Sequence, residues 1–198
     1  MDDATQKSWD NFLDPTVLRK QLIAASVYLA VFELLKDVLV DRIGAFFANQ
    51  YDESGWVASP EYKDEVLSRN MSALYASLDW LRNMEAISEQ DIEVFGKIKA
   101  LRNRIAHNLF EVLASVGLPP EVEDCYIEMR HLIRKVELWW ILNVEVDINP
   151  DLVDKEVAAE TVASGTEIGV ALLGDIAFGD GQISESVYEH FRKAFVDT

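Results

Sequence analysis

Apolar residues recur at helical spacing over most of the first 145 positions, and this pattern predicts four long helices. The expected helices cover residues 14–48, 61–84, 88–115 and 121–144. The first is apolar on nearly all sides, which is typical of a helix surrounded by neighbours or by a partner chain.

Local signals mark where several of these helices begin and end. Asp-Pro at residues 14–15 supplies a cap and a first-turn proline to the first helix. Residues 88–91, Ser-Glu-Gln-Asp, resemble a capping box at the start of the third helix. Glycine and two prolines within residues 117–120 end that helix, and the Gly, Ser and Pro of residues 51–60 predict a loop.

The last fifty residues differ in composition from the rest. Asn-Pro at residues 149–150 marks a boundary, and the small residues that follow predict a weaker helix over 151–178, interrupted near 164–165. After a Gly-Asp-Gly turn, Ser184 or Ser186 is expected to cap a short amphipathic helix.

Together these patterns predict an all-α protein. The only strand candidate, residues 142–148, is short. Long helices joined by short loops favour an up-and-down bundle of four helices over residues 10–145. Residues 146–198 are then a C-terminal helical extension, packed on the bundle or on a partner.

The charge of the chain restricts its partners. Thirty-five acidic residues against 18 basic ones give a formal net charge of -17. Such a field repels polyanions at long range, whereas a general nucleic-acid-binding protein normally carries the opposite sign. Any site for an anion must therefore be local.

Other features exclude several classes of protein. One cysteine and three histidines give neither a disulfide framework nor zinc-ligand spacing, so no metal and no cofactor are expected. The apolar run at residues 22–35 contains Glu33 and is shorter than a membrane span. Because the N-terminus is polar and acidic rather than a signal peptide, a cytoplasmic protein is expected.

One stretch concentrates basic residues: KIKALRNRIAHNLFEVL, residues 97–113. Its apolar residues fill one arc of a helical wheel, and Asn103 and His107, four residues apart, stack on a different face. Arg104 lies close to that face, and Arg102 lies at the edge of the apolar arc. Two further basic residues sit about one turn earlier: Lys97 and Lys99.

These residue types are sufficient for cleavage of a phosphodiester without a metal. A histidine such as His107 can act as general acid or base. The guanidinium of Arg102 can bind phosphate bidentately and stabilise negative charge in the transition state. Arg102 and His107 differ by roughly 140° around one helix, so they converge on one atom only with difficulty. A two-fold partner that presents its own copy of the helix removes this obstacle.

The segment Arg102-Asn103-Arg104-Ile105-Ala106-His107 resembles the signature of the HEPN superfamily (higher eukaryotes and prokaryotes nucleotide-binding domains), an arginine followed after four to six residues by a histidine. In that family a polar residue typically follows the arginine, as Asn103 does here. A toxin subgroup carries a tyrosine two residues after the histidine; this chain has Leu109, so the resemblance does not extend to that subgroup.

The resemblance implies a fold of four or five helices, a homodimer with facing motifs, and a metal-independent endoribonuclease of toxin or phage-defence type. It implies Arg102, Asn103 and His107 as the catalytic residues and an RNA substrate, with an antitoxin or another regulatory protein as partner. Candidates for RNA contact are Arg104, Lys99 and Lys97. Other members of the family have lost activity, so a non-catalytic interaction or regulatory module that binds a protein partner is the alternative.

Simpler interpretations stand beside each of these. His107 can cap or pack without catalysis, and Arg102 can form a structural ion pair with a carboxylate such as Glu33. Lys97 and Lys99 fit a solvated face. A second basic cluster on the fourth helix fits an extended RNA groove, or a surface face balanced by neighbouring glutamates, which is the favoured interpretation; its members are Arg130, His131, Arg134 and Lys135.

Overall fold

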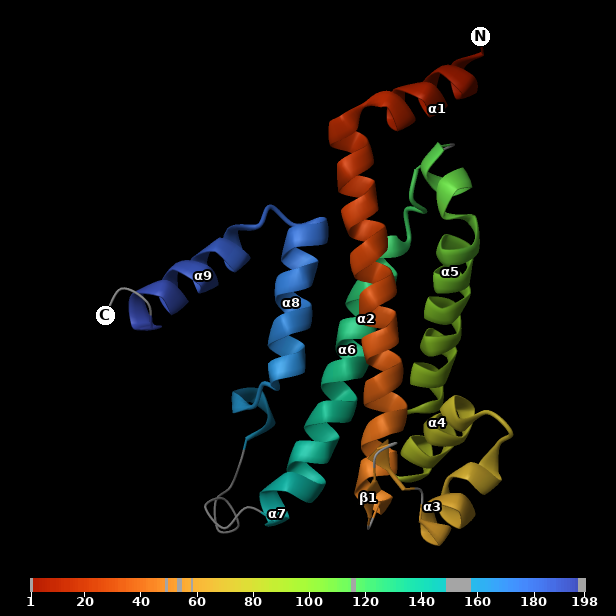
Figure 1. Cartoon of the computed structure of the whole chain (residues 1–198), viewed down its shortest axis with the longest axis vertical. Coiled ribbons are helices and arrows are strands. Elements are labelled where there is room, and N and C mark those ends of the chain that lie inside the picture. Colours follow the sequence, from red (N-terminus) through yellow and green to blue (C-terminus); the bar gives the residue numbers. More distant parts are fainter. Residues whose placement is uncertain are drawn as a thin grey trace. The chain divides into compact units, whose positions relative to one another are not determined.

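The computed structural model of the chain describes residues 2–48, 50–52, 55–57, 59–114, 117–148 and 158–195. These residues are almost entirely helical (Figure 1). Among them, the only strands are β1 (Tyr51–Asp52) and β2 (Gly55–Trp56), which pair antiparallel inside the expected loop. The expected all-helical class is confirmed at this level.

The chain divides into two compact units that combine segments distant in sequence. The first contains Met1–Val31, Ile98–Arg130 and Gly165–Thr198, and the second contains Phe32–Lys97 and His131–Ser164. Three long helices contribute a part to each unit: α2 (Pro15–Phe47), α5 (Glu89–Ala114) and α6 (Val122–Trp140). The expected division between residues 145 and 146 stays a prediction.

In the first unit, α8 (Gly165–Phe178) packs against α6 through one tyrosine. The buried Tyr126 donates its hydroxyl to the Val170 carbonyl at 2.5 Å, and its ring lies 4.9 Å from that of Phe178. Gly174 lies directly on the same ring, because a Cβ added there would come within 2.6 Å of Tyr126 Cε1. Helix α8 therefore lies against the tyrosine ring at a point where the Cβ of any other residue would not fit.

Helix α1 (Asp3–Leu13), also in the first unit, was not expected from the sequence. The Asp2 carboxylate caps it by accepting a hydrogen bond from the Thr5 amide at 2.7 Å. The Ser8 hydroxyl donates to the Ala114 carbonyl at the end of α5. These contacts tie a short polar helix to its neighbour, which the weak apolar pattern of residues 3–13 did not reveal.

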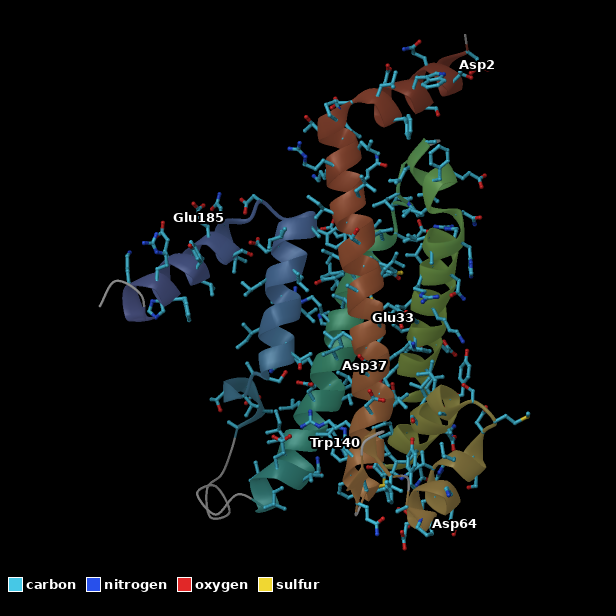
Figure 2. The ribbon with its side chains drawn as sticks, in the orientation of Figure 1. Asp2, Glu33, Asp37, Asp64, Trp140 and Glu185 are labelled. Atoms are coloured by element: carbon cyan, nitrogen blue, oxygen red, sulfur yellow. The ribbon has the colours of Figure 1, made fainter. Side chains whose placement is uncertain are left out.

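The second unit is built around aromatic side chains. Trp140 of α6 is labelled in Figure 2. Trp80 of α4 (Ala73–Asn83) stacks on it at 6.0 Å between ring centroids. The guanidinium of Arg42 lies 5.7 Å from the Trp140 ring centroid and 3.5 Å from the buried Glu137 carboxylate. Arg42 also pairs with Glu145. A charge at the edge of this cluster is thus compensated by carboxylates and an aromatic face.

The helix expected over residues 61–84 is broken. The structure has α3 (Pro60–Glu65), a 3-10 turn (Leu67–Arg69) and α4. At the break Asn70 has an extended backbone, and its side chain accepts a hydrogen bond from the Ser72 amide at 3.0 Å. This local bond competes with the helical ladder, which explains the interruption.

The end of the chain also differs from expectation. Residues 142–148, the strand candidate, are helical: a π turn (Ile141–Glu145) followed by α7 (Val146–Ile148). Helix α9 (Gln182–Phe195) begins before Ser184, so neither Ser184 nor Ser186 caps it. The Asp180 carboxylate instead accepts a hydrogen bond from the Gln182 amide. A 3-10 turn (Ala159–Thr161) precedes α8, while the boundary and helix start expected at residues 149–157 lie outside the described residues.

Across the ranges that the structure describes, no helix has the length and apolar content required to cross a membrane.

The capping box of α5 gives a stability prediction. Asp91 accepts from the Ser88 amide at 2.6 Å, Ser88 Oγ accepts from the Asp91 amide at 3.3 Å, and Lys135 lies 2.5 Å from the Asp91 carboxylate. Burial raises the pKa of Asp91, but hydrogen bonds from Lys135 and Ser88 outweigh it, so the pKa is lower than usual. We expect Asp91→Ala to lower the free energy of unfolding by about 1 kcal/mol at pH 7.

Because the pKa of Asp91 is depressed in the folded state, its stabilisation is complete above the unfolded pKa near 4 and is lost as pH falls through the folded pKa. Urea titrations of wild type and variant at pH 7 and at acidic pH measure this, and the difference should shrink on acidification. Glu93→Ala, an exposed change on the same helix, is the control. A difference that does not depend on pH contradicts the role of the carboxylate.

The contact between Gly174 and Tyr126 gives a second prediction. Alanine usually stabilises a helix by about 1 kcal/mol relative to glycine. At Gly174 the new methyl group would overlap the buried Tyr126 ring, so we expect a net loss of about 1–3 kcal/mol in the free energy of unfolding. Gly169 has open space around its Cβ position, so Gly169→Ala on the same helix should be neutral or stabilising. Thermal unfolding of both variants tests the difference in sign.

Candidate nucleic-acid site on α5

The face of α5 that carries the motif is set by the residues buried on the other side. In the first unit Ile98 and Ile105 are fully buried and Leu101 is nearly so. These three residues occupy one arc at helical spacing. The intervening polar residues of the motif must therefore lie at the edge of this arc or outside it.

Arg102 and Asn103 are in contact and partly buried. Arg102 Nη1 donates a hydrogen bond to Asn103 Oδ1 at 3.2 Å. This bond orients the amide and leaves its NH2 group available as a donor for another acceptor. An arginine and an amide held together in this way form a local cationic donor group that suits a phosphate.

His107 is exposed on the same helix. The backbone of α5 departs from helical geometry first at Asn108, with φ -124° and ψ 25°, which is after the histidine. The segment from Arg102 to His107 is therefore regular helix, and the two side chains leave its axis roughly 140° apart. Within one chain, the structure brings together Arg102 and Asn103 but does not converge His107 on them.

Arg104 belongs to a different feature. Its guanidinium pairs with Glu121 at 2.5 Å. The Glu121 carboxylate accepts hydrogen bonds from the Glu121 backbone amide and from Arg104, and both bonds lower the pKa of this carboxyl group. Together with Asn108 and Glu111, this pair lines a pocket of about 460 Å³, whose apolar wall includes Leu118, Pro119 and Pro120.

The lining of that pocket does not include Arg102, Asn103 or His107. Two carboxylates at its edge make it unfavourable for phosphate. Arg104 is thus engaged by a carboxylate in this structure, and its expected role in RNA contact stays a prediction.

The two lysines differ in exposure. Lys97 is exposed and Lys99 is partly buried. Lys97 is the last α5 residue of the second unit, whereas Lys99 belongs to the first. An exposed lysine is compatible both with a solvated face and with contact to RNA.

Two of the four members of the second basic cluster, on α6, are engaged by structural contacts. Arg134 donates to the carbonyls of Ala159 and Val162, both at 3.3 Å. Lys135 pairs with Asp91 at the capping box of α5. For these two residues the contacts support the structural interpretation over an extended RNA groove. Of the two glutamates expected to balance the cluster, Glu128 and Glu137, the second pairs with Arg42 instead.

One residue near the motif was missed by sequence reasoning. Phe110 is 74% exposed and lies three positions after His107, beyond the kink at Asn108. Its ring meets that of Phe12 edge-on, with centroids 5.8 Å apart. The signal that could have revealed it is an aromatic residue outside the apolar arc of the helix, where a polar side chain is usual.

Comparison with known proteins gives no relative: no family model, curated protein or solved structure matches this chain.

Proposed function

We propose that the protein is a HEPN-like metal-independent ribonuclease of toxin or phage-defence type, acting in the cytoplasm. In this proposal the helices form a four-helix up-and-down bundle, and the site is composite, at a homodimer interface. The observation that carries the proposal is the hydrogen bond between Arg102 and Asn103 on a helix that also presents an exposed His107. An antitoxin or other regulatory protein is the expected cellular partner.

The chemistry follows from these three side chains. Arg102 holds the scissile phosphate and stabilises its added negative charge, while Asn103 donates a hydrogen bond from its NH2 group. The 2′-hydroxyl attacks phosphorus and gives up its proton to a base, and the 5′-oxygen leaves with a proton from an acid. His107 supplies one of these proton transfers. The products are a 2′,3′-cyclic phosphate and a 5′-hydroxyl.

The angle between Arg102 and His107 explains why the proposal requires two chains. Side chains that leave a straight helix roughly 140° apart cannot readily contact the same phosphate. In a two-fold dimer, the arginine of one copy and the histidine of the other can approach one substrate from facing helices. One copy then contributes the phosphate-binding group and the other the proton-transfer group.

Phe110 extends the site in this proposal. An exposed aromatic ring close to the histidine can stack on an RNA base, which contributes roughly 1–3 kcal/mol and depends little on sequence. Stacking adds affinity that does not depend on charge, which matters in a chain of net charge -17. Phe110 is a binding residue here rather than a catalytic one.

The first test is cleavage of a mixed RNA substrate in EDTA, with analysis of the product ends. We expect wild type to leave 2′,3′-cyclic phosphates and His107→Ala to lose activity by about 100-fold or more, since general acid–base catalysis is removed. The exposed side chain predicts little change in the free energy of unfolding. His131→Ala, an exposed histidine on α6, is the matched control and should keep activity.

Arg102→Lys sharpens that experiment, because lysine keeps the charge but not the planar pair of donors. We expect it to lose most activity. Cleavage that survives in His107→Ala, or that requires a divalent metal, contradicts the proposal.

A separate prediction concerns Phe110. We expect Phe110→Ala to raise the KM for RNA by about tenfold or more while kcat changes little, because a base loses its stacking partner. Phe110→Trp keeps an aromatic face and should restore the KM. Steady-state kinetics on one defined RNA measure both, and equal kinetics for the alanine and tryptophan variants contradict stacking.

The alternative is a non-catalytic interaction module that binds a protein partner. It is favoured by the carboxylates of Glu111 on the motif helix and Glu121 beside it, and by the net charge of -17, which suits a basic partner better than RNA. A folded protein that cleaves no RNA at high concentration and retains a basic protein partner would support this alternative.

A further inference from the structure

Helix α9 presents an apolar face that α8 covers only at one end. Near its start, the Ser184 amide donates to the Asp175 carboxylate at 2.9 Å, and the Ser184 hydroxyl donates to the Leu172 carbonyl at 3.2 Å. Figure 1 shows α9 extending away from α8 beyond this point. Four apolar residues along it are 44–62% exposed: Ile183, Val187, Tyr188 and Phe191.

The neighbouring helix also exposes apolar residues. Helix α8 exposes three large apolar residues of its own: Ile168, Leu173 and Ile176. Scattered apolar residues are normal on a protein surface, but a set that follows one helix face is typical of an interaction site. We define the α9 face as the four exposed apolar residues of α9 named above.

The charges of α9 are divided along its length. Glu185 and Glu189 lie in the first part, and Arg192 and Lys193 lie in the last turn. With His190 neutral, these charges sum to zero, in a chain whose net charge is -17. A helix that lies on a membrane surface is usually rich in lysine and arginine on its polar face, so this charge distribution does not favour a lipid partner.

We propose that the α9 face pairs with the α9 face of a second copy of the chain, with the two helices antiparallel. Glu185 and Arg192 lie three residues inside the two ends of α9, Gln182 and Phe195. In an antiparallel pair centred on the helix, Glu185 of each copy therefore lies opposite Arg192 of the partner subunit.

The helical wheel supports the same register. Residues seven apart differ by only about 20° around a helix, so Glu185 and Arg192 lie on one flank of the α9 face. In an antiparallel pair related by two-fold symmetry, equivalent flanks face each other. Both ion pairs then form at once. They lie beside Val187, Tyr188 and Phe191 of the α9 face, which the pairing buries. Glu189 and Lys193, which lie 3.9 Å apart within one helix, stay on the outer side.

The choice of occupant rests on this charge complementarity. A second copy matches the acidic start and basic end of α9 by symmetry alone, and exposed charges at the rim of an interface set the specificity and register of pairing. The pairing involves none of the motif residues. It therefore stands or falls separately from the facing motifs that the proposed function requires.

The test is the oligomeric state of the full chain, measured by sedimentation velocity over a range of concentrations. We expect a reversible dimer in wild type. Glu185→Arg and Arg192→Glu should each weaken dimerisation by about tenfold or more, because each replaces two attractive contacts by two like-charge contacts. Asp64→Arg, an exposed charge reversal on α3, is the control and should leave the dimer unchanged.

Charge rescue separates this proposal from a general loss of stability. The double variant Glu185→Arg/Arg192→Glu restores both pairs in reversed order and should recover the dimer. A mixture of the two single variants should form a heterodimer, because one helix is then basic and the other acidic at both positions. Val187→Asp should prevent association through α9 by placing a charge in the α9 face.

A monomeric wild type, or a dimer unaffected by every α9 variant, overturns the proposal. Failure of the double variant to recover the dimer also overturns it. RNA cleavage by the same variants is measured separately. His107-dependent cleavage by a chain whose association no α9 variant changes refutes the α9 pairing and supports the ribonuclease, and a charge-dependent dimer without cleavage does the reverse.

Discussion

The burial of one face of α5 is the constraint on which the candidate site depends. Ile98, Leu101 and Ile105 are buried on one side of this helix, and their burial sets the rotation of the helix about its axis. That rotation places Arg102 and Asn103 in a partly buried position and His107 in solvent. A partly buried guanidinium needs a partner, and the neighbouring amide supplies one of its hydrogen bonds. The apolar residues of the motif thus determine the geometry of its polar ones.

The balance between local and global charge shapes every functional interpretation of this chain. The protein has a net charge of -17, so it repels RNA at distances up to about a Debye length, roughly 10 Å at moderate ionic strength. Within contact distance Coulomb attraction grows as distance and dielectric constant fall, so the proposed RNA site depends on short-range contact with an arginine. Arg134 and Lys135 on α6 are engaged by backbone carbonyls and by Asp91, while Arg102 on α5 is hydrogen-bonded to Asn103. The proposed chemistry lies on α5.

The sequence predicted the helices where strong local signals agree with apolar periodicity. Helix α2 begins at Pro15 and ends at Phe47, and the capping box at Ser88 and Asp91 is present as expected. The prediction of one continuous helix failed at Asn70. There the side chain accepts a hydrogen bond from the Ser72 amide, and the helix breaks. The unexpected α1 is held by tertiary contacts to α5, and such contacts leave little trace in the periodicity of a short polar segment.

The sequence by itself determined the helical class, the chemical identity of the motif residues and the angle between Arg102 and His107, because these follow from composition and from the fixed pitch of an α-helix. Only the tertiary structure decided which charges are already engaged, that Phe110 is exposed beside the motif, and that the α9 face is left uncovered by α8. Exposure and pairing depend on which segments meet in space. Residues 8 and 114, or 42 and 137, are neighbours only after folding, and no local pattern records that they meet.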